Sequence, residues 1–177
     1  MKKIINTILI ISLTILSLTG CSKENVKETS ASPAGTMSEI IDNIYKQKDT
    51  TLRLATTELD LQDKDQLLYY TGLNDSSKIK EAAVSEAMIT SQAYSMVLVR
   101  VNEITDVNTV AKEMLNGINQ NKWICVGADD LKVATCGDTI MLIMVASSLS
   151  DYVTSDNMVD AFKTVCGGSI DQTLTKE

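Results

Sequence analysis

The amino-acid sequence predicts one α+β domain, in which a mixed or antiparallel sheet of about five strands packs with about four helices. The chain has 177 residues, 44% hydrophobic and 22% charged, which is typical of a single globular domain. Segments with helical and with strand periodicity alternate from residue 36 onward. Short turns join some of the expected strands and helices join others, a mixture that indicates an α+β fold.

Four segments place apolar side chains at helical spacing. The first begins with the capping box Thr36-Met37-Ser38-Glu39, and the other three cover residues 63–70, 106–118 and 155–165. Asp106 and Ser155 are the expected N-caps of the last two helices. Gly72 and Gly167-Gly168 are expected to end the second and the fourth.

Four other segments have the residue types of strands. They cover residues 51–59, 94–101, 131–136 and 139–147. Gly137-Asp138, between the last two, predicts a tight hairpin. Residues 140–145 are apolar on both faces, so they are expected at the centre of the sheet with a layer on each side. Residues 79–90 fit either a helix or a strand, and the sequence leaves the two alternatives open.

The N-terminus has the pattern of a bacterial lipoprotein signal. Met1-Lys2-Lys3 is a short basic region, and the largely apolar residues 4–18 are too few to span a bilayer comfortably. Leu18-Thr19-Gly20-Cys21 resembles the lipobox, which implies cleavage between Gly20 and Cys21 and a lipid on the Cys21 sulfur. The alternative is an ordinary secretory signal with a cysteine there by chance.

The expected organisation is therefore a signal peptide (residues 1–20), a lipidated cysteine with a flexible tether (21–35) and the α+β domain (36–177). The tether is expected because Ser22 to Gly35 contains one large apolar residue, Val26. This organisation places the protein on the outer face of the cell membrane. Lipid rather than charge must hold it there, since its net charge of −7 is repelled by anionic lipids.

Several features occur in an order that resembles a known family. They are Leu59-Asp60 after a strand, Tyr70-Thr71-Gly72-Leu73, the strand 94–101, Trp123, and the strand pair from Val133 to Ile140. The chain from its first helix to Phe162 resembles the domain of unknown function 4358, found in small lipoproteins of Firmicutes. The resemblance implies a location and a fold, and it implies no particular activity.

The composition excludes several kinds of chemistry. The sequence has no histidine, which excludes Ser-His-Asp and Cys-His catalysis and every metal site that needs an imidazole. The acidic balance argues against a nucleic-acid partner. There is no Cys-x-x-Cys and no glycine-rich phosphate loop. We therefore predict no catalytic, cofactor-binding or metal-binding residue, and no enzymatic activity.

The remaining candidates each have a structural alternative. Cys125 and Cys136 are a candidate disulfide, and the alternative is a set of buried free thiols. Trp123 is a candidate interface residue, and the alternative is a place in the core. The acidic cluster Glu58, Asp60, Asp63 and Asp65 does not fit an EF-hand, and acids at a helix N-terminus explain it better.

These observations favour a non-enzymatic binding or adaptor module of the cell envelope, with an envelope protein as its partner. One alternative is a small-solute-binding accessory lipoprotein. The other is an extracytoplasmic enzyme that depends on a thiol or a carboxylate. The sequence predicts neither the ligand nor the oligomeric state.

Overall fold

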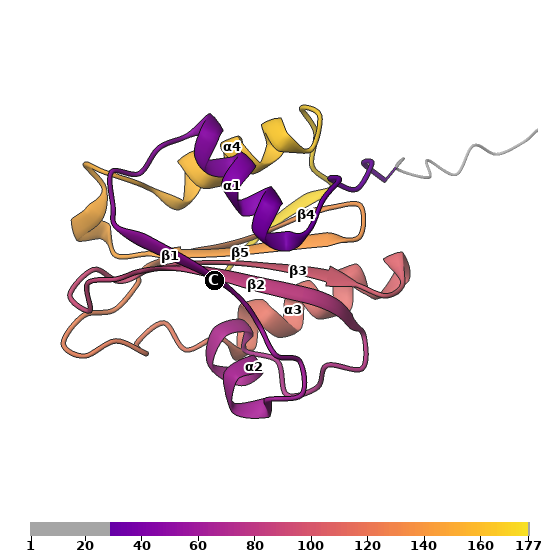
Figure 1. Ribbon diagram of the computed structural model, residues 1–177, viewed down its shortest axis with the longest axis horizontal. Helices are drawn as coiled ribbons and strands as arrows, with labels where there is room; N and C mark the ends of the chain where they lie inside the picture. Colours follow the sequence, from indigo (N-terminus) through magenta and orange to yellow (C-terminus); the bar gives the residue numbers. More distant parts are fainter. Residues whose placement is uncertain (1–28, 177) are drawn as a thin grey trace, which may run out of the picture.

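A six-stranded antiparallel sheet crosses the molecule between two layers of helices (Figure 1). The structure is a computed structural model that describes residues 29–176, so the expected signal peptide and Cys21 lie outside the described residues. The strands are β1 (Leu54–Glu58), β2 (Ile79–Ala87), β3 (Tyr94–Val101), β4 (Asp130–Cys136), β5 (Thr139–Val145) and β6 (Gln172–Thr175). Their order is β1-β2-β3-β5-β4-β6, and every neighbouring pair is antiparallel. The predicted α+β fold is confirmed, with one strand more than expected.

Helices cover both faces of this sheet. They are α1 (Met37–Gln47), α2 (Lys64–Thr71), α3 (Val107–Gly117) and α4 (Ser155–Val165), with the short 3-10 turns η1 (Ile104–Asp106) and η2 (Ser147–Leu149). In Figure 1, α1 and α4 lie on one face, and α2 and α3 lie on the other. Within residues 29–176, no helix has the length and apolar character needed to cross a membrane.

The two central strands, β3 and β5, are buried at every position. Their register places Leu98 opposite Met141 and Val97 opposite Leu142. Because helices cover both faces, the side chains of both parities enter the core, and the strands therefore lack the alternation of a half-exposed strand. The expectation that residues 140–145 lie at the centre of the sheet is confirmed.

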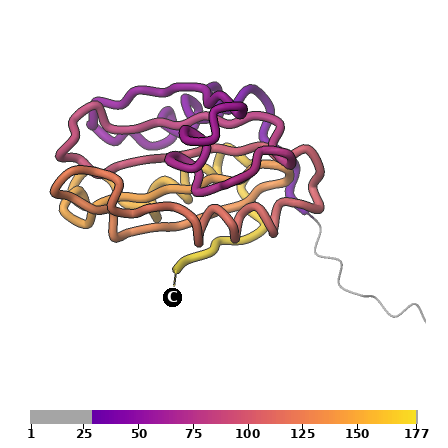
Figure 2. Tube along the Cα trace, turned by 90° about the horizontal axis from the view of Figure 1, so that it is seen from below, coloured from indigo at the N-terminus to yellow at the C-terminus, as the bar shows by residue number. Residues whose placement is uncertain are grey.

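The strands with the weakest sequence signals, β2 and β6, lie outside the central pair of strands. Most of the segment 79–90, which fitted either a helix or a strand, is strand β2, which lies between β1 and β3 and pairs with both. β6, which the sequence did not predict, pairs with β4 and places Leu174 opposite Val133. In Figure 2 the yellow β6 lies along the edge opposite the early, indigo and purple elements.

The ends of the helices follow the predicted capping chemistry in two cases. In α1, the Glu39 backbone N–H donates to Thr36 Oγ1 over 3.2 Å, and the Thr36 N–H donates to Glu39 Oε2 over 2.9 Å. In α2, Asp63 Oδ1 accepts from the Gln66 N–H over 3.0 Å, and Gly72 ends the helix at φ 76°.

Of the other two expected N-caps, Asp106 occupies the N-cap position of α3 without a capping hydrogen bond, and Ser155 is wrong. Asp106 lies in η1 and makes no capping hydrogen bond; its carboxylate lies 3.2 Å from Lys78 Nζ instead. The cap of α4 is Thr154, which accepts from the Asn157 N–H, one residue earlier than expected. Ser155 is buried and donates to Asp130 from both its N–H and its hydroxyl. This tertiary contact occupies the hydroxyl that was expected to cap the helix.

The chain already lies on the domain from Ser30, six residues before the expected start of the domain at residue 36. The Ser30 N–H donates to Asp171 Oδ1 over 2.6 Å. The Asp138 N–H, in the β4–β5 turn, donates to Ser32 Oγ over 2.9 Å. Residues 30–35, which we call the docked segment, are held mainly through backbone groups, and an apolar pattern in the sequence cannot reveal that kind of contact.

A buried arginine of β3 holds the rest of the docked segment. Arg100 donates from Nη2 to the Pro33 carbonyl over 2.8 Å and from Nη1 to the Gly35 carbonyl over 3.0 Å. Its charge is balanced by Glu81, 2.5 Å from Nη1, and by Asp138, 3.3 Å from Nε. A buried cation needs such partners, so Arg100, the turn and the docked segment form one unit.

A hydroxyl cluster joins α1 to the sheet. The Tyr45 hydroxyl donates to Ser85 Oγ over 2.8 Å and lies 3.1 Å from the Tyr94 hydroxyl. Burial raises the pKa of Tyr45 to about 12 and raises the pKa of Tyr94 well above its ordinary value, because a buried phenolate loses its hydration.

This cluster predicts how the stability depends on alkaline pH. Above pH 10 the unfolded chain releases the Tyr45 proton first, so the free energy of unfolding falls by about 1.4 kcal/mol per pH unit for this residue until about pH 12. Tyr45→Phe should cost about 1 kcal/mol at neutral pH, because Ser85 and Tyr94 lose a partner, but it should then show a shallower alkaline decline. Urea unfolding of both proteins across this range measures the two slopes, and equal slopes would contradict the prediction.

Candidate interaction site

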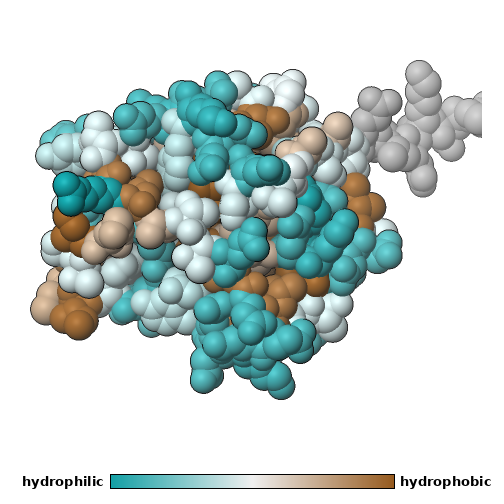
Figure 3. Space-filling model, viewed as in Figure 1, coloured by the Kyte–Doolittle hydropathy of each residue, from teal (hydrophilic) through white to brown (hydrophobic). Residues whose placement is uncertain are grey.

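Exposed apolar side chains gather in three loops at one end of the sheet. These loops are residues 88–93 between β2 and β3, 118–129 between α3 and β4, and 146–154 between β5 and α4. They carry four of the seven exposed large apolar residues in the described part of the chain: Met88 (67% exposed), Ile89 (45%), Ile124 (81%) and Tyr152 (55%). We call these three loops the apolar end, and Figure 3 shows brown, apolar surface gathered at the left, where they lie.

The docked segment lies at the opposite end of the sheet. It contacts Arg100 near the end of β3 and the turn between β4 and β5, whereas the apolar end contains the start of β3, the start of β4 and the end of β5. In Figure 1 the described chain begins at the right and the apolar loops lie at the left. The N-terminal segment and the apolar end therefore face in opposite directions.

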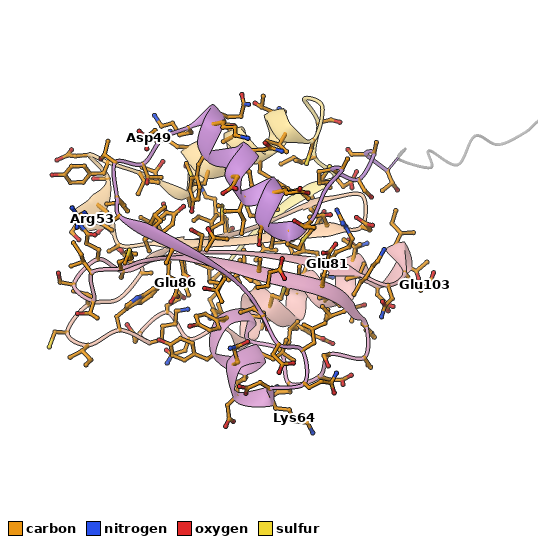
Figure 4. The ribbon with its side chains drawn as sticks, viewed as in Figure 1. Asp49, Arg53, Lys64, Glu81, Glu86 and Glu103 are labelled. Atoms are coloured by element: carbon orange, nitrogen blue, oxygen red, sulfur yellow. The ribbon has the colours of Figure 1, made fainter. Side chains whose placement is uncertain are left out.

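A buried lysine fastens the longest of these loops to the sheet. The side chain of Lys122 is 1% exposed, and its Nζ lies 2.5 Å from Glu86 Oε1. The same Nζ donates to Ser95 Oγ over 3.3 Å. Glu86 and Ser95 are opposite each other in the pairing of β2 with β3, and Figure 4 shows Glu86 on β2 nearer the apolar end than Glu81.

Three aromatic rings surround this ammonium group. The ring centroids of Tyr69, Tyr70 and Trp123 lie 4.7, 4.9 and 5.1 Å from Lys122 Nζ. Tyr69 and Tyr70 meet edge to face, with their centroids 4.9 Å apart. Rings at these distances attract a cation through their quadrupoles, and in other proteins such cages bind the ammonium group of a ligand. Here the chain's own lysine occupies the cage.

Burial and the neighbouring carboxylate act on the Lys122 ammonium in opposite directions. Burial lowers the pKa of Lys122, and the Glu86 carboxylate opposes that shift. Burial, together with the Glu86 charge, raises the pKa of Tyr69 and of Tyr70. We therefore interpret the ion pair of Lys122 and Glu86 as a structural contact that holds the loop to the sheet, because the two side chains balance each other's charge within the protein.

A close approach of two helices places the tyrosines of the cage. A Cβ added at Gly117, the last residue of α3, would lie 2.1 Å from the Gly72 carbonyl oxygen at the end of α2. Glycine at this position lets the two backbones touch. The contact sets α2 against α3 and so brings Tyr69 and Tyr70 over the loop that carries Lys122.

Trp123 lies between its two predicted environments. It is half-buried, packs against the hydrophobic core and covers Lys122. The next residues, Ile124 and Cys125, are exposed, and Cys125 has a positive φ of 65°. The sequence singled out Trp123 and missed Ile124 and Met88. The available signal for Ile124 was an apolar side chain in a segment with neither helix nor strand pattern, whereas Met88 lay in the segment 79–90 that fitted either a helix or a strand.

The candidate disulfide between Cys125 and Cys136 does not form, and the alternative of buried free thiols holds for Cys136 and Cys166 but not for Cys125. Both thiols are free, Cys125 being exposed in the apolar end and Cys136 buried at the last position of β4. The length of β4 lies between them, whereas a disulfide needs Cα atoms about 4.4–6.8 Å apart. The cysteine next to Cys136 is Cys166, at the end of α4, and each of the two shifts the pKa of the other.

The acidic residues serve as caps and turn formers. Asp63 caps α2, and Asp60 Oδ1 accepts from the Gln62 N–H over 2.9 Å. Asp129 Oδ1 accepts from the Ser147 N–H over 2.6 Å, and this bond lowers the pKa of Asp129. In residues 29–176, no group of three or more Cys, Asp or Glu side chains is arranged to hold a metal ion.

A polar hollow of the described surface lies beside the contact between α2 and α3. Its volume is about 730 Å³, and its polar lining includes Asn74, Asp75, Asn108, Lys112 and Glu113. A smaller hollow of about 390 Å³, lined by Leu68 and Tyr69 of α2 with Asn119, lies next to the aromatic cage.

No protein-family model, curated protein or solved structure matches the chain. The resemblance to the domain of unknown function 4358 therefore stays a prediction. The geometry of the chain itself is the basis for the functional proposals that follow.

The cage predicts a large cost for removing its cation. Lys122→Met leaves the Glu86 carboxylate facing aromatic rings without a partner, so the free energy of unfolding should fall by about 2 kcal/mol. Urea unfolding followed by the fluorescence of Trp123, the single tryptophan, measures the change. The matched control is Lys78→Met, which removes the more exposed ion pair with Asp106 and should cost less than about 1 kcal/mol. Equal costs for the two variants would contradict the structural role of the cage.

Proposed function

We propose that this protein is an outward-facing membrane lipoprotein whose domain is a non-enzymatic binding module for another protein of the cell envelope. The observation that carries the proposal is the position of the exposed apolar side chains. They lie at the end of the sheet opposite the docked segment, which joins the domain to the expected anchor at Cys21. An anchored domain then presents this end away from the bilayer.

The properties of the apolar end support a protein partner. Ile124 and Met88 are among the most exposed apolar side chains of the described chain, and such residues in one region mark interaction sites. Tyr152 adds an aromatic ring of the kind enriched at interfaces. The Lys122 cage fixes the loop that carries Ile124, and a pre-ordered loop loses less conformational entropy on binding.

A second candidate function is capture of a small polar solute. The hollow of about 730 Å³ between α2 and α3 supports it, since amide, ammonium and carboxylate groups line that surface. A screen of polar solutes for a rise in melting temperature tests it, with Asn108→Leu as the variant that should remove the rise.

The apolar end makes a prediction about the partner. With a photo-reactive residue placed at Tyr152 in intact cells, one protein should be captured repeatedly. Ile124→Asp should reduce the captured amount by at least about tenfold, because a charge at the centre of an interface removes a hot-spot contact.

The matched control is Ile104→Asp. Ile104 is 50% exposed, and it follows β3 at the end that holds the docked segment. This variant should capture the partner as well as the wild type does. Equal losses in both variants, or capture of this chain alone, would count against a separate protein partner at the apolar end.

The anchor makes a separate prediction. Cys21→Ala removes the thiol that receives the lipid, so the protein should leave the membrane fraction for the medium or the soluble fraction. Fractionation and immunoblotting measure the distribution, with Cys125→Ala as a control that keeps the wild-type pattern. A Cys21→Ala protein that sediments fully with the membrane would refute the lipid anchor.

A further inference from the structure

Two buried cysteines meet at the end of the sheet that holds the docked segment. Cys136 is the last residue of β4 and is fully buried, and Cys166 is the C-cap of α4 and 7% exposed. The chain that follows Cys166 runs beside the end of β4, where the Asp171 N–H donates to the Thr135 carbonyl over 2.8 Å, and each cysteine shifts the pKa of the other. The two cysteines are far apart in sequence and belong to different layers, so the fold alone brings the sulfur atoms together.

The pair is part of a short chain of hydrogen bonds. The Cys136 thiol donates to the Ala31 carbonyl of the docked segment over 3.2 Å. The contact with Cys166 lowers the pKa of Cys136 and raises the pKa of Cys166, as expected when Cys166 donates its proton toward Cys136.

The backbone that follows Cys166 lies at an open part of the surface. Gly167 and Gly168, which follow Cys166, are both exposed, and a Cβ added at either would meet nothing within 4 Å. Open space thus lies beside Cys166, the less buried of the two cysteines. On the other side, residues of the docked segment cover Cys136.

We propose that Cys136 and Cys166 form a reversible disulfide that fastens the end of α4 to the end of β4. The oxidant is an external disulfide, RSSR. One cysteine thiolate attacks RSSR and releases RS⁻, which gives a mixed disulfide; the second thiolate then displaces the other RS⁻ and closes the intramolecular bond. Two protein thiols and one RSSR thus yield one protein disulfide and two RSH, with the two protein protons on the released thiols.

The disulfide needs little movement of the protein to form, and it should stabilise the fold. Thiols that lie close enough to shift each other's pKa need a small movement to reach an S–S length of about 2.05 Å. The bond closes a loop of about thirty residues, and constraining such a loop in the unfolded chain should raise the melting temperature by about 10 °C. Oxidation also removes the proton that Cys136 donates to Ala31. The chemistry does not require the proposed anchor, but an extracytoplasmic location would supply an oxidising setting.

The test uses the full chain with Cys125→Ser, which removes the exposed thiol, and oxidised glutathione as the probe. After alkylation of the remaining thiols and proteolysis, mass spectrometry should find the Cys136 and Cys166 peptides joined and two hydrogens lighter. The melting temperature should rise by about 10 °C and return to its starting value with dithiothreitol. Peptide mapping separates this pair from Cys21.

Two controls keep the outcome decisive. Cys125→Ser/Cys166→Ser should give neither an internal disulfide nor the rise in melting temperature. The wild type reports the activity of the oxidant, since its exposed Cys125 should take up glutathione. The proposal is overturned if Cys136 and Cys166 stay alkylatable while Cys125 is modified, or if either one keeps glutathione as a stable mixed disulfide. An internal disulfide without a rise in melting temperature would overturn the claim that the bond stabilises the attachment of α4 to β4.

Discussion

The burial of both faces of the central strands is the constraint on which the rest of this structure depends. β3 and β5 place every side chain in the core, so each face of the sheet needs its own layer of helices. α1 and α4 supply one layer, and α2 and α3 supply the other (Figure 1). With both faces covered, little of the sheet is left for recognition, and the surfaces open to partners are the loops at its two ends and the outer sides of the helices.

Two buried cations organise those two ends in parallel ways. At one end Arg100, balanced by Glu81 and Asp138, holds the docked segment through its backbone carbonyls. At the other, Lys122 is balanced by Glu86 and holds a loop through aromatic rings. In each case a charge that would be costly to bury alone is paired on the sheet and fixes a segment without regular secondary structure.

The predictable part of this fold is the part that local chemistry decides. Thr36 with Glu39, and Gly72, act on neighbouring backbone groups, so helix ends could be located from the sequence. The continuous apolar run of β5 likewise predicted its central place. Long-range contacts could not be predicted in this way. Ser155 donates to Asp130 instead of capping its helix, and the cysteine next to Cys136 is Cys166 rather than Cys125. The aromatic cage joins α2, β2 and a loop, and no spacing in the sequence predicts that these three segments are in contact.

The docked segment also sets the reach of the domain. From the proposed anchor at Cys21 to Ser30, the first of its residues, the chain has about nine residues and extends at most about 30 Å. β3 adds about 25 Å from one end of the sheet to the other. In the proposed anchored arrangement, the apolar loops would therefore lie within about 55 Å of the bilayer. A partner resident in the same membrane would meet them at a high effective concentration, so even a weak contact would suffice, whereas a partner beyond that distance would be out of range.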